Sequence, residues 1–218
     1  TVIKKFTYAI FKNKKNEKKL VYYPVAKNAN SSAKLFFLKH LKIDKNYYFL
    51  GDKVPEYKIN QDDKYKNLDK NFNLVNFLPS YTPFEKIDVD EKCCIIRDPI
   101  KRFVSAYKNR ILYHKDVAFQ NLDIDEIIEK LENNLFDNRH FLPQSYWLGD
   151  DLKYFTIVAN ISNMETFING VNNFFQSKID FPRIQTGGVG ENIDLTNSQI
   201  TKLKKIYSSD YDLIGDLL

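Results

Sequence analysis

Residues 92–99, KCCIIRDP, constrain the fold more than any other segment of the chain. Four consecutive apolar residues without polar alternation are typical of a strand that is buried on both faces. The Asp-Pro pair that follows is a strong helix start, because Asp98 can cap a helix and Pro99 suits its first position. The chain should therefore contain a buried strand that leads directly into a helix.

Strand and helix patterns alternate elsewhere in the same way. Apolar and aromatic runs at 20–25 and 154–159 predict two more buried strands, and apolar residues at helical spacing follow each of them. The helix over 31–43 is expected to begin with Ser31 or Ser32 as its cap. Strands that alternate with helices imply a parallel sheet covered on both faces. We therefore predict an α/β fold with a central, mainly parallel sheet flanked by helices.

The chain is predicted to form a single domain over residues 1–218. It contains no internal repeat and no long Gly, Ser or Pro linker. A chain of this length buries roughly 70% of the surface that its unfolded form exposes, so its core needs no disulfide or structural metal. Residues 44–91 are polar and lack a long periodic pattern, and we expect a variable insert of loops and short strands there.

Cysteine usage indicates the redox compartment of the protein, and the charge distribution indicates the kind of partner it binds. Cys93 and Cys94 are adjacent in an apolar run, which favours buried thiols and a reducing compartment over a disulfide. The net charge is +5, but residues 1–50 alone carry +10, from twelve Lys and two acidic residues. This asymmetry indicates an anionic partner near the N-terminal quarter, although the run KNKKNEKK (12–19) by itself is interpreted as solvated surface.

No stretch approaches the ~18 apolar residues that a membrane span needs, and the N-terminus lacks the pattern of a secretory leader. The abundance of Lys, Asn, Ile and Tyr fits an A/T-rich coding genome. We therefore expect a cytoplasmic bacterial protein, with a trimmed, membrane-anchored parent as the alternative.

The segment VAKNANSS (25–32) is a candidate phosphate or sulfate site. Ligands of open parallel sheets bind where strands end and helices begin, because free amides at helix N-termini attract anions. This junction offers Lys27, the hydroxyls of Ser31 and Ser32, and a row of backbone N–H groups. It contains no glycine, so it is not the GxxxxGK[ST] loop of nucleoside triphosphatases. The alternative is an ordinary helix start with an incidental lysine.

The segment RDPIKRFVSAY (97–107) forms a second such junction. Arg97 leaves the strand and Ser105 lies about two turns into the helix, so a guanidinium and a hydroxyl could hold one phosphate dianion. Arg102 lies three residues before Ser105 on a neighbouring helix face. Either arginine could instead pair with a local acid.

These segments resemble the sulfotransferases that use 3′-phosphoadenosine 5′-phosphosulfate (PAPS) as donor. Residues 97–107 are similar to the 3′-phosphate motif RDPxxRxxSxY of these enzymes. Residues 25–32 are similar to their 5′-phosphosulfate loop PKxxxTS, with Ala26 in place of proline and Ser31 in place of threonine. RHFLPQSYWL (139–148) is similar to the H-x-x-P-Q region of the carbohydrate branch, which includes the chondroitin, dermatan and HNK-1 enzymes and bacterial relatives.

The resemblance extends over most of residues 20–215, because 157–175 and 194–214 are similar to the closing strand and helices of that branch. It implies a P-loop-NTPase-like, three-layer fold, PAPS as donor substrate, 3′,5′-ADP as product, and sulfuryl transfer to a hydroxyl of a carbohydrate or glycoconjugate acceptor. The implied donor-binding residues are Lys27, Asn28, Ala29, Asn30, Ser31, Ser32, Arg97 and Ser105. Lys27 would support the leaving bridging oxygen, while Arg97 and Ser105 would hold the 3′-phosphate. No metal is expected, since no cluster of His, Cys and Asp has metal-ligand spacing.

Sulfuryl transfer is an in-line displacement that depends on positioning and charge stabilisation, and a general base should take the proton of the acceptor. Of the three histidines, His140 is predicted to be this catalytic base, because it lies in the family-like HFLPQ stretch, whereas His40 lies among lysines on a predicted helix and His114 follows the 3′-phosphate helix. A carboxylate from 44–91, which is expected to line the acceptor pocket with the loops near His140, stays open as the base. The glycine loop 186–190 is similar in position, but not in sequence, to a loop that closes over the donor in cytosolic sulfotransferases. The resemblance implies a lid, with a plain flexible connection as the alternative.

Two other functions stay open at this stage. A small-molecule kinase could share the fold, although the glycine-free loop and the lack of a recognisable magnesium site argue against it. A non-enzymatic binder of nucleic acid or anionic glycan is motivated by the basic N-terminal quarter, and steep salt dependence would favour it. A nucleic-acid partner is not expected.

Overall fold

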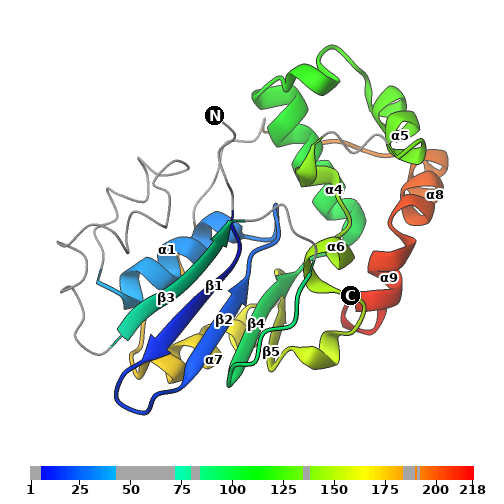
Figure 1. Ribbon diagram of the computed structural model, residues 1–218. Helices are drawn as coiled ribbons and strands as arrows, with labels where there is room; N and C mark the ends of the chain where they lie inside the picture. Colours follow the sequence, from blue (N-terminus) through cyan, green and yellow to red (C-terminus); the bar gives the residue numbers. More distant parts are fainter. Residues whose placement is uncertain (1–5, 43–71, 80–83, 135–137, 184–189, 191) are drawn as a thin grey trace.

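The computed structural model describes residues 6–42, 72–79, 84–134, 138–183, 190 and 192–218 (Figure 1). A five-stranded sheet in the order β3-β1-β2-β4-β5 forms its centre. The strands are β1 (Phe6–Asn13), β2 (Lys19–Tyr23), β3 (Phe72–Pro79), β4 (Glu91–Ile96) and β5 (Ile157–Asn160). The neighbours β2, β4 and β5 are parallel, as predicted. The sequence patterns did not predict β1, which pairs antiparallel with both β2 and β3.

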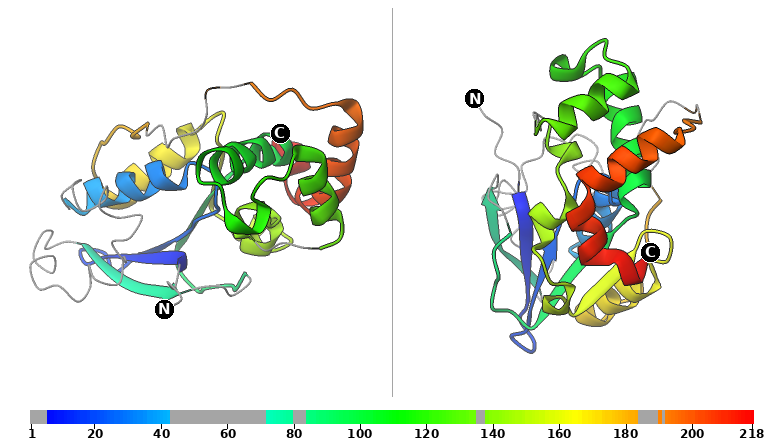
Figure 2. Two further views of the ribbon diagram at one scale, coloured as in Figure 1. Left: turned by 90° about the horizontal axis from the view of Figure 1, so that it is seen from above. Right: turned by 90° about the vertical axis from the view of Figure 1, so that its right-hand side faces the viewer.

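Helices cover both faces of the sheet, which makes three layers (Figure 2). One face is covered by α1 (Asn30–His40) and α7 (Glu165–Phe175), and the other by α6 (Gln144–Leu148) and α9 (Ser208–Ile214). A helical lobe beside the sheet contains α4 (Pro99–Tyr107), a π-helix (Lys108–Tyr113), α5 (Ile124–Glu132) and α8 (Asn197–Ile206). Short 3-10 turns occupy Val117–Phe119, Arg139–Phe141, Leu152–Tyr154 and Gly215–Leu217. The predicted α/β class is confirmed.

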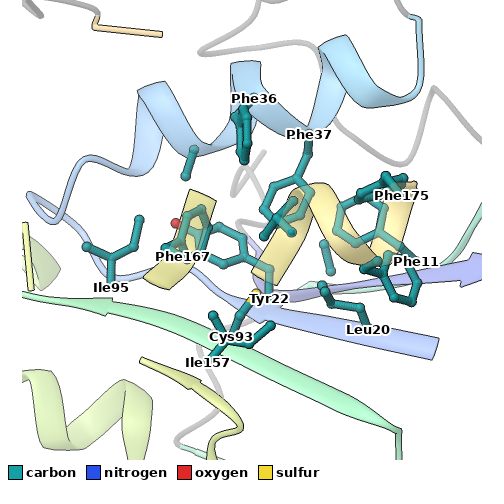
Figure 3. Close-up of a cluster of buried hydrophobic side chains, with 14 of the residues drawn as sticks. Phe11, Leu20, Tyr22, Phe36, Phe37, Cys93, Ile95, Ile157, Phe167 and Phe175 are labelled. Carbon is teal, nitrogen blue, oxygen red and sulfur yellow. The ribbon is translucent and has the colours of Figure 1, made fainter. Parts of the chain in front are cut away.

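Aromatic side chains fill the layer between the sheet and its first helical face (Figure 3). Phe37 of α1 stacks on Phe11 of β1 with ring centroids 4.5 Å apart, and Phe167 of α7 meets Tyr22 edge-on. Alternate strand residues point to the opposite layer, because successive side chains of a strand face opposite sides. Cys93 and Cys94 thus enter different layers, and both are free and buried, which confirms the predicted buried thiols. Burial raises the pKa of both thiols.

The predicted helix start at Asp98 and Pro99 is confirmed by its cap, and α8 begins with a capping box. The Asp98 carboxylate accepts a hydrogen bond from Lys101 N at 2.8 Å, and Thr196 with Gln199 forms a reciprocal capping box. The predicted cap of α1 is wrong, because α1 begins at Asn30 after Ala29, whose backbone is left-handed at φ 54°. The predicted cap residues Ser31 and Ser32 therefore lie inside the first turn. None of the helices in the described part of the chain is both long and apolar enough to cross a membrane.

Candidate active site

The two predicted phosphate-binding junctions lie side by side at one edge of the sheet. Tyr23, the last residue of β2, pairs with Cys94 in the parallel strand β4, so the chain leaves both strands at the same edge. The link is direct, because the Arg97 guanidinium donates a hydrogen bond to Lys27 O at 2.9 Å. The lysine-rich turn 14–18 precedes β2 and is exposed at the opposite end of that strand. Its charge therefore lies away from these junctions.

The loop between β2 and α1 has backbone angles that are typical of anion-binding loops. Lys27 and Ala29 both have left-handed backbones, at φ 70° and 54°. Left-handed residues that alternate with ordinary ones turn successive backbone N–H groups toward one side. The loop also enters the N-terminus of α1, where the helix dipole favours negative charge. The position and shape of residues 25–32 therefore suit a phosphate or sulfate group.

Asn28 shapes this loop from inside. Its side chain is fully buried and donates to Ile95 O at 2.8 Å and to Gln144 Oε1 at 2.6 Å. Its backbone N–H is also used within the loop, since it donates to Val25 O at 3.2 Å. Asn28 was predicted to bind the donor through its backbone N–H. In this structure both its side chain and its backbone N–H hold the loop in shape.

Gln144 joins the two junctions, a role that the sequence did not predict. Its side chain is fully buried at the start of α6. Besides the bond to Asn28, Gln144 Oε1 accepts from Arg97 N at 3.1 Å and Gln144 Nε2 donates to Arg97 O at 2.8 Å. The only sequence signal for Gln144 is its place in the stretch 139–148, which resembles the H-x-x-P-Q region of the carbohydrate branch.

Arg97 lies where the second junction was predicted, half-buried at the end of β4. Its Nε is buried and has no hydrogen-bond partner among the described residues. Burial and the nearby charge of Arg102 lower the pKa of Arg97, while Asp98 opposes that shift. Ser105 lies half-buried in the second turn of α4, and no hydrogen bond joins it to Arg97 in the described part of the structure.

Arg102 is a buried support for the loop. Its guanidinium is 1% exposed and donates to Ala26 O at 2.9 Å and to Leu142 O at 2.7 Å. Burial lowers the pKa of Arg102, whereas the negative charge of Asp210 raises it. Both arginines thus donate to backbone carbonyls on neighbouring loops.

Helix α9 is hydrogen-bonded to the start of α6, next to the two junctions. Asp210 is fully buried, and its carboxylate accepts from Ser145 N at 2.8 Å and from Gln144 Nε2 at 3.4 Å. Tyr207, just before α9, donates its hydroxyl to Phe141 O at 2.8 Å. The tail 194–214, which resembles the closing helix of the carbohydrate branch, therefore holds the loop that carries His140.

His140 lies in the 3-10 turn Arg139–Phe141. It is close enough to Lys27 for the positive charge of Lys27 to affect the pKa of His140. Burial, followed by the positive charges of Arg110, Arg139, Lys27 and Arg102, lowers the pKa of His140 to about 2. The imidazole is therefore neutral at physiological pH. Burial also lowers the pKa of Arg139 to about 10.

The other two histidines have different surroundings. His40 is buried at the end of α1, stacks on Phe175 with ring centroids 4.6 Å apart, and places Nδ1 2.7 Å from Ser177 Oγ. Burial lowers the pKa of His40 to about 4. His114 is exposed after the π-helix. His40 is thus a residue of the aromatic core and not of the site.

Two predicted features fall largely outside the described residues. The predicted lid Thr186–Gly190 is described only at Gly190, which is exposed, and the predicted insert 44–91 is described only from Phe72 to Pro79 and from Phe84 onward. Within the described residues, no group of three or more His, Cys, Asp or Glu side chains could hold a metal ion.

Comparison with known proteins agrees with this geometry. The sequence profile of the sulfotransferase family matches residues 12–215, which include both junctions, α6 and α9. A search of curated proteins found no match, and a search of solved structures found none either. Because the match covers nearly the whole chain, this protein belongs to the sulfotransferase family, whose fold is P-loop-like and whose reaction is sulfuryl transfer.

Proposed function

We propose that this protein transfers the sulfuryl group of PAPS to a hydroxyl of a carbohydrate or glycoconjugate and releases 3′,5′-ADP. The observation that carries the proposal is the hydrogen bond from the Arg97 guanidinium to Lys27 O, which joins the two proposed anion-binding junctions at the ends of neighbouring parallel strands. A donor with a phosphosulfate at one end and a 3′-phosphate at the other requires two such junctions. The glycan acceptor is supported by the similarity of residues 139–148 to the carbohydrate branch.

The donor would bind across both junctions. Lys27, with the loop from Ala29 to Ser32, would hold the 5′-phosphosulfate, and Arg97 with Ser105 would hold the 3′-phosphate. Lys27 would stabilise the negative charge that grows on the bridging oxygen as the S–O bond breaks. The buried Nε of Arg97, which has no partner among the described residues, is a donor that a phosphate oxygen could satisfy.

His140 would act as the general base. The acceptor hydroxyl would attack the sulfur in line with the leaving oxygen and pass its proton to the neutral imidazole. Positive neighbours weaken this base in the free protein. A bound polyanionic donor would offset their charge and raise the pKa of His140 toward the range where it can accept a proton.

Thermal stabilisation by nucleotides tests donor binding. We expect 3′,5′-ADP to raise Tm more than AMP does, and Arg97→Ala and Ser105→Ala to reduce mainly the 3′,5′-ADP effect. Arg183→Ala and Ser198→Ala change exposed residues of the same types and serve as controls. Equal losses for both nucleotides would refute the 3′-phosphate assignment. Incubation with labelled PAPS and a panel of glycans then tests transfer, and turnover of ATP with magnesium instead would indicate a kinase.

A further inference from the structure

Asn138 connects His140 to a second polar group, Asp116. Asn138 Oδ1 accepts from His140 N–H at 3.0 Å and lies 2.7 Å from His140 Nδ1. Asn138 Nδ2 donates to the Asp116 carboxylate. That carboxylate also accepts hydrogen bonds from Arg110 Nε at 2.7 Å and from a second nitrogen of the same guanidinium at 2.5 Å. A continuous hydrogen-bonded chain thus runs from Arg110 through Asp116 and Asn138 to the imidazole.

The orientation of the Asn138 amide follows from its partners and not from an arbitrary choice. A backbone N–H can only donate, so the group facing His140 N must be the amide oxygen. An ionised carboxylate can only accept, so the group facing Asp116 must be the amide nitrogen. The two partners lie on opposite sides of the amide and require the same orientation, which removes the usual ambiguity of an asparagine flip.

This orientation decides which imidazole nitrogen carries the proton. Because Asn138 Oδ1 is an acceptor, the nitrogen 2.7 Å away, Nδ1, must be the donor. In a neutral imidazole the other nitrogen, Nε2, then holds the lone pair. Among the described residues Nε2 has no hydrogen-bond partner, so its lone pair is available to a substrate.

We propose that Asn138 is a positioning residue that holds His140 as the Nδ1–H tautomer and leaves Nε2 to accept the proton of the attacking hydroxyl. The proposal rests on the proposed function of His140 as the base. The O–H bond of the acceptor breaks and an Nε2–H bond forms while the acceptor oxygen bonds to sulfur. The bond from sulfur to the bridging oxygen of PAPS breaks, and 3′,5′-ADP leaves with that oxygen and its electron pair. The imidazolium then returns its proton to water. Asn138 Oδ1 accepts from Nδ1–H throughout, so no side chain has to reorient during the step.

The chain of contacts also links the base to the donor side. Arg110 lies in the π-helix that continues α4, the helix that carries Ser105. Asp116 forms an ion pair with Arg110, whose positive charge acts on His140 together with those of Arg139, Lys27 and Arg102. Helix α4 therefore supports both the proposed 3′-phosphate site and, through Arg110 and Asp116, the orientation of the base.

Nitrogen-15 NMR of the imidazoles tests the proposal without relying on activity. The protein has only three histidines, and the spectrum of His140→Gln assigns the signals of His140 by difference. At neutral pH the wild-type protein should show His140 protonated at Nδ1 and unprotonated at Nε2. Protonation of Nε2 in place of Nδ1 would overturn the proposal.

Variants of Asn138 provide the catalytic readout. Leu is close to Asn in shape but offers no acceptor, so Asn138→Leu should redistribute the tautomers and lower kcat about 100-fold, the low end of what a general base contributes. The Tm increase produced by 3′,5′-ADP should stay unchanged. Asn138→Asp alone would set two carboxylates against each other, so it is combined with Asp116→Asn. The double variant keeps an acceptor for both His140 atoms and an amide donor between the two side chains, and it should retain the Nδ1–H tautomer and most of kcat.

Three outcomes separate this inference from the proposed function. Wild-type kcat in Asn138→Leu would overturn the role of Asn138. If Asn138→Leu fails to fold, a loss of the Nδ1–H tautomer in the folded double variant, Asn138→Asp with Asp116→Asn, would overturn it equally. Full sulfuryl transfer by His140→Gln would refute the positioning role and the base, yet would leave PAPS-dependent transfer standing.

Discussion

The Nδ2 atom of Asn28 donates a hydrogen bond of 2.6 Å to Oε1 of Gln144, across 116 residues of sequence. Both side chains are fully buried, and Gln144 also bonds the backbone N–H and C=O of Arg97. One amide group therefore sets the position of the loop that contains Lys27 relative to the end of β4. The spacing between two proposed phosphate sites depends on a residue that is proposed to touch neither phosphate.

Replacing Gln144 should therefore affect both stability and donor binding. Gln144→Ala leaves the Asn28 amide and the Arg97 N–H buried without their partner, which should cost about 1–3 kcal/mol in the free energy of unfolding. The Kd for 3′,5′-ADP should rise as well. Urea unfolding and ligand titration measure the two effects, with the exposed Gln120→Ala as control. A destabilised variant that binds 3′,5′-ADP normally would show that Gln144 does not set the site.

Lys27→Met should remove the charge while keeping most of the side chain's length. If Lys27 stabilises the leaving oxygen, kcat should fall about 10²- to 10³-fold, as it does when one donor to a developing anion is removed. Lys14→Met, in the exposed turn at the opposite end of β2, should keep wild-type kcat. Transfer of labelled sulfate under saturating PAPS measures both, and similar losses in the two variants would point to a general effect of charge.

Arg102→Met should be among the most destabilising single substitutions in the chain. It leaves two backbone carbonyls, Ala26 O and Leu142 O, without their donor. It also removes a positive charge that interacts with the buried carboxylate of Asp210. Loss of one partner from a buried charged network costs about 3–5 kcal/mol. Calorimetric Tm values compare it with Arg183→Met at an exposed arginine. A Tm within a degree or so of the control would contradict the supporting role of Arg102.

Acid should destabilise the protein through His40. The folded-state pKa of His40 is about 4, below its ordinary value of 6.5, so the unfolded chain binds the proton more readily than the folded protein does. Stability is therefore unaffected by this group above pH 6.5 and falls as the pH drops from 6.5 toward 4, by up to about 3 kcal/mol. His40→Phe keeps an aromatic ring against Phe175 and should show a smaller loss between pH 7 and pH 4.5.

Urea midpoints at the two pH values measure that difference. His114→Gln, at an exposed histidine, is the matched control and should behave like the wild-type protein. The same acid sensitivity in His40→Phe and wild type would exclude His40 as its source.

Local patterns predicted those elements whose partners are close in the chain. The start of α4 follows from Asp98 and Pro99 because the cap is completed by Lys101, three residues after Asp98. The capping box at Thr196 is equally local. The buried thiols of Cys93 and Cys94 follow from the apolar run around them. Strand β1, which the sequence patterns did not predict, has one close and one distant partner. Its pairing with β2 joins residues 7 to 13 positions apart, whereas its pairing with β3 joins residues 59 to 73 positions apart, across the polar insert.

The sequence by itself determined the α/β class, the two junctions and the placement of Lys27, Arg97 and Ser105 on them, because each rests on a short motif next to a strand or helix end. Only the tertiary structure decided the cap of α1, since nothing local marks Ala29 as left-handed. It also decided the roles of Arg102, Gln144 and Asp210. Their partners lie 40 to 116 residues away, and the value of a buried hydrogen bond depends on which distant group the fold brings to it.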